Sequence, residues 1–236
     1  MAYDTKRNAV FSFGGFYNNE SFNDLRMLEN SDWKTVSTLP EMKAAEPGLV
    51  YDIHRDKLVA FGGSAGMGQL NSDTWEWDGI SWKKFSGAGP QGRQAFAMVY
   101  DALRKKTVLY GGMGNNTQTT FSDTWEYDGN QWIKVSDSLP GPRISHSFAY
   151  DSRRGMTVIF GGMVNGVFRN DLWGWNGVQW TKLSESGPEP RVMGYMAYDK
   201  VRDRIVLFGG RVGWPNDVND LWEWDGSTWT KKAFQR

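Results

Sequence analysis

The chain contains no cysteine, which excludes disulfide bonds, thiolate metal sites and cysteine nucleophiles. Its 27 basic and 27 acidic side chains give a net charge of zero, so it lacks the electrostatic footprint of a nucleic-acid or anionic-membrane binder. No apolar stretch reaches the roughly 18 residues that span a bilayer. No signal peptide is visible, because Met1 runs directly into repeat material. We therefore expect a soluble protein. A cysteine-free chain suits the cytosol and the exterior equally, so composition does not fix the compartment.

Glycine and aromatic residues are abundant instead, with 28 glycines, 13 tryptophans and 15% aromatic residues in all. A Gly-Gly pair recurs five times at intervals of 48, 49, 50 and 48 residues, each time after an aromatic residue that ends a short apolar run. A repeat of this length indicates an array of similar units. We expect a single domain, residues 1–236. Its five repeats span about 1–42, 43–91, 92–141, 142–189 and 190–236.

One repeat, residues 143–184, contains four short runs with strand-like character. The runs are residues 144–151, 156–160, 172–175 and 179–183, and Asn176-Gly177 between the last two is a strong hairpin signal. The apolar residues of this repeat show no helical periodicity. Four antiparallel strands per repeat predict an all-β fold, namely a five-bladed β-propeller of four-stranded antiparallel blades whose ring is closed. Blade 1 has the most divergent sequence and the shortest inner strand, so we expect it to be the least stable.

Three further columns recur in every repeat. A Tyr-Asp pair ends the first strand, an aspartate opens the third, and a tryptophan lies in the fourth. Together with the aromatic-Gly-Gly motif, these columns resemble the kelch repeat over essentially the whole chain. That resemblance implies a propeller with one repeat per blade. Because the columns are equivalent in all repeats, we interpret the glycine, aspartate and tryptophan residues as scaffold.

Recognition is expected on the loops that join the second and third strands, since these vary while the opposite turns are short and similar. The loops are residues 16–23, 64–72, 113–122, 163–170 and 211–219. Their apolar and amide side chains, Met67 and Asn116 among them, suit recognition. The candidate ligand-binding residues on this face are Phe16, Tyr17, Arg93, Arg143, His146, Arg191, Arg211 and Trp214.

Two of these assignments have a structural alternative. Arg93, Arg143 and Arg191 share one column at the start of the first strand. They either pair with a neighbouring aspartate, to which a guanidinium is suited, or form an anion-binding mouth. His146 stands alone in its column and is more often a packed inner-strand residue than a ligand or base. His54 belongs to a turn on the opposite face, so the two histidines cannot share a metal site.

Three functions remain open. The first is a monomeric, non-catalytic module that binds a protein segment or a glycan, with no cofactor and no metal. The second is an enzyme of sugar or small-metabolite conversion. Its candidate catalytic residues would be Arg143, His146, Arg191, Glu20 and Asp217. No nucleophile–base pair follows from their spacing, so we favour a binding role. The third is an engineered or excised repeat scaffold without a ligand.

Overall fold

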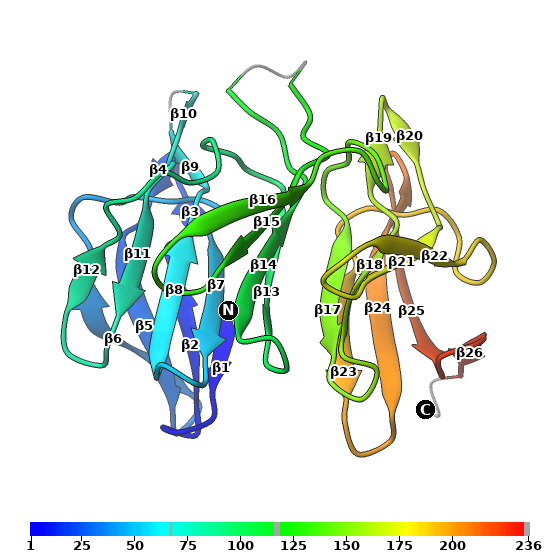
Figure 1. Cartoon of the computed structure of the whole chain (residues 1–236), viewed down its shortest axis with the longest axis horizontal. Coiled ribbons are helices and arrows are strands. Elements are labelled where there is room, and N and C mark those ends of the chain that lie inside the picture. Colours follow the sequence, from blue (N-terminus) through cyan, green and yellow to red (C-terminus); the bar gives the residue numbers. More distant parts are fainter. Residues whose placement is uncertain (67, 116–118, 234–236) are drawn as a thin grey trace.

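The computed structural model describes residues 1–66, 68–115 and 119–233 (Figure 1). These residues form β-strands joined by turns and loops, and no helix among them could cross a membrane. Five four-stranded antiparallel sheets are arranged as a five-bladed β-propeller, which confirms the fold class predicted from the repeats.

Each blade runs from an inner strand at the channel to an outer strand at the rim. Blade 1 consists of β1 (Ala2–Asp4), β2 (Ala9–Phe13), β5 (Asp24–Glu29) and β6 (Asp32–Thr38). Blade 2 consists of β7 (Gly48–Asp52), β8 (Lys57–Phe61), β11 (Thr74–Trp77) and β12 (Trp82–Lys84). Blade 3 consists of β13 (Ala97–Asp101), β14 (Lys106–Tyr110), β15 (Thr124–Tyr127) and β16 (Trp132–Ser136). Blade 4 consists of β17 (Ser147–Asp151), β18 (Met156–Phe160), β21 (Leu172–Trp175) and β22 (Trp180–Ser184). Blade 5 consists of β23 (Tyr195–Asp199), β24 (Arg204–Gly213), β25 (Asn216–Trp224) and β26 (Trp229–Lys232).

Small hairpins extend three of the variable loops at one end of the ring (Figure 1). They are β3–β4 (Phe16–Tyr17 and Glu20–Ser21), β9–β10 (Ser64–Gly66 and Gln69–Leu70) and β19–β20 (Met163–Val164 and Val167–Phe168). In blade 5, the long strands β24 and β25 themselves extend to this end. We call this end the loop face. The opposite end carries the short turns between the first two strands of each blade.

The inner strands β1, β7, β13, β17 and β23 line one central channel. In blade 4 the inner strand is shorter than the predicted run, because it begins at Ser147 rather than at residue 144. Ser145 has φ 54°, which turns the backbone before the strand begins. Ile144 instead makes an isolated bridge with Met163. The residues before the strand therefore belong to the loop-face end of the channel.

Neighbouring blades pack through repeated aromatic contacts. In blades 1 to 4, the aromatic residue before the Gly-Gly pair lies against the fourth-strand tryptophan of the next blade. The ring centroids are 5.2 Å apart for Phe13–Trp82, 5.8 Å for Phe61–Trp132, 5.0 Å for Tyr110–Trp180 and 5.4 Å for Phe160–Trp229. Such pairs contribute about 0.5–1.5 kcal/mol beyond the area that they bury. The tryptophan column is thus part of the scaffold, as the repeats indicate.

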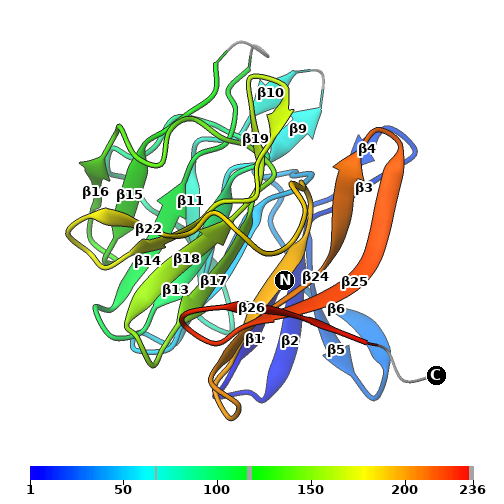
Figure 2. The same ribbon diagram turned by 90° about the vertical axis from the view of Figure 1, so that its right-hand side faces the viewer.

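The contact between blade 5 and blade 1 differs from the other four, and we call it the seam. Phe208 of blade 5 and Trp33 of blade 1 occupy the same two columns, but each is 43% exposed. Leu28 of blade 1 stands where the other blades have Trp77, Tyr127, Trp175 or Trp224, so it offers less apolar area to a neighbour. Figure 2 shows β24–β26 on the same side of the molecule as β1, β2, β5 and β6. Blade 5 and blade 1 are therefore packed less tightly against each other than the other neighbouring blades, and closure of the ring stays a prediction.

We expect amide hydrogen exchange to be faster in residues 1–38 than in residues 143–184. Leu28, Trp33 and Val36 in the outer strands of blade 1 are all exposed, so few apolar contacts resist local opening there. Hydrogen exchange followed by mass spectrometry checks this. Equal protection of the two segments would contradict it.

Candidate functional site

A cavity of about 440 Å³ lies where the channel opens on the loop face, and we call it the mouth pocket. Every blade contributes to its lining. The lining residues are Phe16, Ala45, Glu46, Ser64, Gln94, Ala95, Met113, Ile144, Ser145, Met163, Val192, Met193 and Trp214. Because no two blades supply the same set of side chains, the pocket is asymmetric although the scaffold around it repeats.

Four residues of this lining share an unusual backbone conformation. Glu46, Ala95, Ser145 and Met193 have φ between 53° and 57° and occupy the same position, just before the inner strand, in blades 2 to 5. The backbone N–H of Ser145 donates to the Ala95 carbonyl at 2.9 Å, and that of Met193 to the Ser145 carbonyl at 2.8 Å. The left-handed conformation costs a non-glycine residue about 1–2 kcal/mol. The backbone is thus repeated while the side chain varies, so this column gives each part of the pocket its own chemistry.

The walls of the mouth pocket are mainly apolar. Phe16, Met113 and Met163 directly follow the Gly-Gly pairs of their blades, and Met193 comes from the left-handed column. Methionine is flexible and polarizable, so surfaces that contain it adapt to apolar partners. Glu46 is the only ionisable residue of the lining, and it forms no ion pair within the part of the chain that the structure describes.

Trp214 stands at the rim and is 64% exposed. The Arg211 guanidinium lies over its ring, 4.4 Å from the centroid, and Phe168 meets it edge-on at 6.3 Å. Arg211 Nε also donates to Asp217 Oδ1 at 2.6 Å, and this hydrogen bond lowers the pKa of the Asp217 carboxyl. Arg211 is therefore held by Asp217 and covers one face of the indole.

The three arginines of the strand-leading column are buried in ion pairs. Arg143 Nη1 and Nη2 donate to the two carboxylate oxygens of Asp171, both at 3.0 Å, and Nη1 also donates to the Gly161 carbonyl. The equivalent pairs are Arg93–Asp123 and Arg191–Asp220, each with distances of 2.6 and 3.1 Å. The arginines thus make the bidentate pairs that were one of the two alternatives, and these guanidinium groups are engaged within their own blades.

A tryptophan side chain completes each of these pairs. The indole N–H of Trp173 donates to Asp171 at 2.6 Å, and Trp125 and Trp222 do the same for Asp123 and Asp220. Burial raises the pKa of the Asp171 carboxyl, but the Arg143 and Trp173 donors outweigh burial, so its pKa lies below the usual value. Asp123, Asp171 and Asp220, whose pKa values are all lowered, are therefore ionised scaffold residues.

His146 is buried beside the same scaffold. Its ring lies 5.2 Å from that of Tyr110 and 5.9 Å from that of Phe148, both in edge-on contacts. Burial, together with the charge of Arg143, lowers the pKa of His146 to about 3. Among the described residues neither ring nitrogen has a hydrogen-bond partner. His146 is thus a neutral packing residue at physiological pH.

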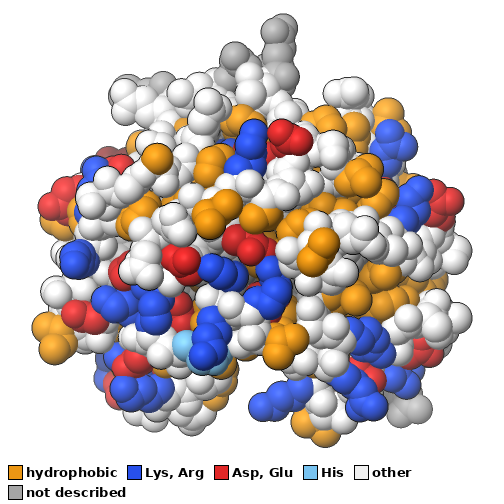
Figure 3. Space-filling view, in the orientation of Figure 1, with side chains coloured by type: hydrophobic (Ala, Val, Ile, Leu, Met, Phe, Trp, Pro, Cys, Tyr) orange, Lys and Arg blue, Asp and Glu red, His pale blue; other side chains and the backbone are white. Residues whose placement is uncertain are grey.

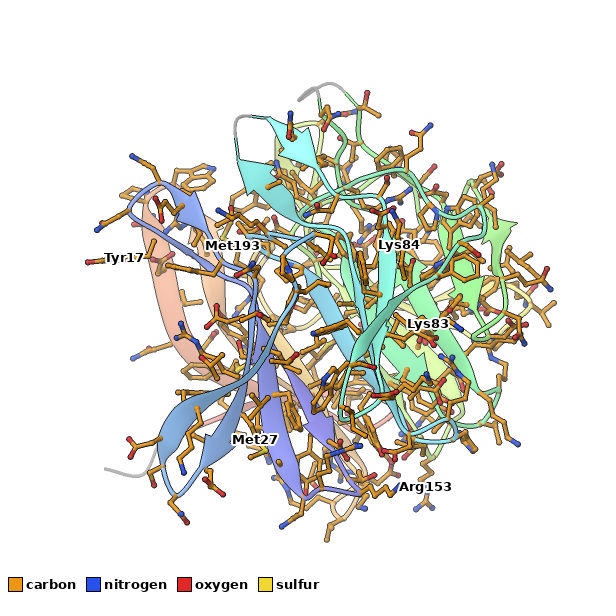
Figure 4. All side chains as sticks on the ribbon, turned by 90° about the vertical axis from the view of Figure 1, so that its left-hand side faces the viewer. Tyr17, Met27, Lys83, Lys84, Arg153 and Met193 are labelled. Carbon is orange, nitrogen blue, oxygen red and sulfur yellow. The ribbon has the colours of Figure 1, made fainter. Side chains whose placement is uncertain are left out.

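The structure brings together only part of the predicted site. Phe16 and Trp214 line the mouth pocket and Arg211 lies beside it, whereas Tyr17 points outward from the β3–β4 hairpin (Figure 4). The arginine pairs and His146 lie in the blades, and Met67 and Asn116 lie outside the described residues. Glu46 and Met193 are absent from the sequence prediction, whereas Met113 and Met163 lie in the predicted variable loops but were not among the candidate residues. The signal that could have found Glu46 and Met193 is the non-repeating column two residues after Ala44, Arg93, Arg143 and Arg191.

The residues considered for catalysis do not converge. Arg143, Arg191 and His146 are buried, Asp217 is paired with Arg211, and Glu20 is exposed in β4. Within residues 1–66, 68–115 and 119–233, no group of three or more histidine, aspartate or glutamate side chains is placed to hold a metal ion. On the side of the ring seen in Figure 3, basic and acidic side chains are interspersed.

Neither a protein-family model nor a curated protein matches this sequence. The structure and the repeats together therefore define the chain as a five-bladed repeat β-propeller, with an apolar, asymmetric pocket at the mouth of its channel.

Proposed function

We propose that this protein is a kelch-type interaction module without catalytic activity, and that it binds a segment of a partner protein in the mouth pocket. The observation that carries the proposal is the contrast between a repeated scaffold and a pocket whose lining does not repeat. Symmetric positions serve the fold, so specificity has to come from side chains that differ between blades.

The size and chemistry of the pocket favour an apolar side chain as its occupant. Ligand sites commonly have volumes of about 300–1,000 Å³ and combine apolar walls with few polar groups. The mouth pocket falls in this range, and its walls carry methionine, phenylalanine and aliphatic side chains. The channel mouth is also rigid, because hydrogen bonds such as Met193 N–H to Ser145 join its rim from blade to blade. A rigid apolar pocket suits one or two large side chains of a peptide.

A protein segment is favoured over a glycan by the state of Trp214. Sugars bind to proteins largely by stacking on an open aromatic face with polar groups around it. Here one face of the Trp214 indole is covered by Arg211, which Asp217 holds in place. The remaining lining of the pocket has few polar side chains, namely Glu46, Ser64, Gln94 and Ser145.

Loss of Phe16 and Trp214 together is expected to weaken binding at least about 30-fold, since aromatic anchors in interfaces often contribute about 2 kcal/mol or more. A peptide array and a glycan array would first identify a ligand. Calorimetry would then compare the parent with the Phe16→Ala/Trp214→Ala variant. Both side chains are exposed, so the melting temperature should change little.

Ile80→Ala is the matched control, because Ile80 is an exposed apolar residue in a hairpin far from the loop face. It should leave the affinity unchanged. A peptide that binds the double variant as tightly as the parent would show that the site lies elsewhere. If only glycans bind, the protein-segment proposal is wrong. If neither array detects binding, the result would favour a scaffold without a ligand.

A further inference from the structure

The segments that lead into the inner strands are held by the preceding blade. These strand-leading segments are residues 44–48, 93–97, 143–147 and 191–195. In each case the second glycine of the preceding blade donates its N–H to the carbonyl of the first residue. The distances are 2.8 Å for Gly15–Ala44, 2.9 Å for Gly63–Arg93, 3.0 Å for Gly112–Arg143 and 2.8 Å for Gly162–Arg191. Blades 1 to 4 thus each hold a short piece of chain beside their Gly-Gly pair, and this piece bends at its left-handed third residue.

The first glycine of each pair makes room for that piece of chain. Gly161 has φ 66°, and a Cβ placed on it would lie 2.6 Å from the Arg191 carbonyl oxygen. A Cβ on Gly111 would lie 2.7 Å from the carbonyl oxygen of Arg143. Real Cβ atoms do not approach an oxygen so closely, so the incoming backbone requires glycine here.

Blade 5 keeps the same two glycine conformations, but no strand-leading segment within the described part of the chain lies in its groove. Gly209 has φ 64°, and a Cβ placed on it would meet only the Val218 carbonyl of its own blade, at 3.2 Å, among the described residues. A cavity of about 300 Å³ lies along this surface, and we call it the seam groove. It is lined by Met193, Tyr195, Phe208, Gly209, Gly210, Arg211, Asp217 and Val218. The geometry that accepts a strand-leading segment in blades 1 to 4 is therefore present in blade 5, where no such segment occupies it among the described residues.

One column also indicates the shape of what fits. At the first position of the inner strand, blades 2 to 4 have Gly48, Ala97 and Ser147, whereas blade 5 has Tyr195. A Cβ on Gly48 would lie 2.8 Å from the Phe96 ring of the next blade, so a small residue there faces a large one. Ser147 instead faces Gly194 and donates to its carbonyl at 2.7 Å. Tyr195 is 76% exposed at the groove. Because the residues that face each other at this position differ in size, we expect a glycine to fit opposite the large Tyr195 side chain.

We propose that the seam groove binds a peptide segment of a partner protein in the bent conformation of the strand-leading segments, with a backbone carbonyl against Gly209 and a glycine opposite Tyr195. The chain itself supplies the template for such a segment. Residues 190–194, with the sequence Pro-Arg-Val-Met-Gly, already lie on blade 4 in this manner and place a glycine at the required position. Peptides that complete a sheet-based structure gain affinity from main-chain contacts and specificity from alternate side chains. This groove is distinct from the interior of the mouth pocket, although Met193 lines both.

A fluorescent peptide with the sequence of residues 187–196 is the probe, titrated with the full chain. We expect saturable binding, and at least tenfold weaker binding of a peptide in which phenylalanine replaces the residue corresponding to Gly194. The protein variant Tyr195→Gly should reverse this preference, since Gly48 at the same position of blade 2 faces the large Phe96 ring. Tyr17→Gly is the matched control, because Tyr17 is also an exposed tyrosine and lies away from the groove.

Several outcomes would overturn the proposal. One is the absence of binding at millimolar peptide. Another is an equal affinity of the glycine and phenylalanine peptides for the parent protein. A dimer that Tyr195→Arg converts to monomers would show that a second copy of the chain fills the groove instead. The Phe16→Ala/Trp214→Ala variant should still bind the probe. Loss of binding there would place the peptide in the mouth pocket.

Discussion

Replacing Trp180 by alanine is expected to lower the free energy of unfolding by about 3–5 kcal/mol, the usual range for emptying a large aromatic site in a core. Trp180 is only 5% exposed. Its ring contacts Tyr110 at 5.0 Å and Trp175 at 5.7 Å, and its indole N–H donates to Thr124 Oγ1 at 2.8 Å. The substitution removes apolar contacts from two blades at once and leaves the Thr124 hydroxyl without its donor. Urea unfolding of the two proteins measures the difference.

Trp33→Ala is the matched control for this experiment. Trp33 occupies the same column in blade 1 but is 43% exposed at the seam, so much less apolar area is lost. We expect a cost of about 1 kcal/mol or less, as is common for partly exposed sites. Equal losses for the two variants would show that the seam is packed like the other blade contacts. A negligible loss for Trp180→Ala would show that this column does not carry the inter-blade packing.

Replacing Arg143 by methionine is expected to cost about 3–5 kcal/mol, because breaking a buried ion pair leaves an uncompensated charge. Methionine keeps much of the side-chain volume but none of the donors. Asp171 would then lose two hydrogen bonds, and the Gly161 carbonyl would lose one. Arg143 was a candidate binding residue by sequence, yet it is the Asp171 pair that its loss would disrupt. A variant as stable as the parent would show that this pair contributes no net stability.

The pH dependence separates this cause from simple loss of packing. The folded-state pKa of Asp171 is lowered, so its contribution to stability is present above the unfolded-state pKa of about 3.9 and is lost as the pH falls through the folded value. The stability deficit of Arg143→Met should therefore be large at pH 7 and shrink at pH 3, where protonation neutralises the stranded carboxyl. A deficit of equal size at both pH values would indicate lost packing instead.

The strand order of the blades could be predicted from the sequence because it depends on local patterns. In blade 4, Asn176-Gly177 marks the outer hairpin, and the run that ends at Phe160 forms the second strand as expected. The start of the inner strand was predicted less well. Residues 144–146 have a strand-like composition, but the turn at Ser145 and the bond from its N–H to Ala95 remove them from the sheet. A contact with another blade thus overrides a local preference.

The position of each candidate site residue in the folded chain likewise depended on contacts between residues far apart in the sequence. The sequence places Arg143 and Trp214 on one face, but it does not reveal whether a guanidinium meets a carboxylate 28 positions along the chain. Ion pairing of this kind depends on distances of a few ångströms, which only the folded chain fixes. The mouth pocket was missed in part for the same reason. Glu46 and Met193 are 147 residues apart, and they share one cavity only because the ring returns the chain to its axis.

By itself the sequence determined the four-stranded blade and the number of blades. Each strand, turn and glycine pair is specified within about fifty residues, and the pattern recurs five times. It also separated scaffold columns from variable loops. Only the tertiary structure decided that the strand-leading arginines are held by aspartates, that a left-handed column faces the channel mouth, and that the seam between blade 5 and blade 1 stays more exposed. These features arise from contacts between repeats, where burial and hydrogen-bond geometry, rather than local propensity, select the outcome.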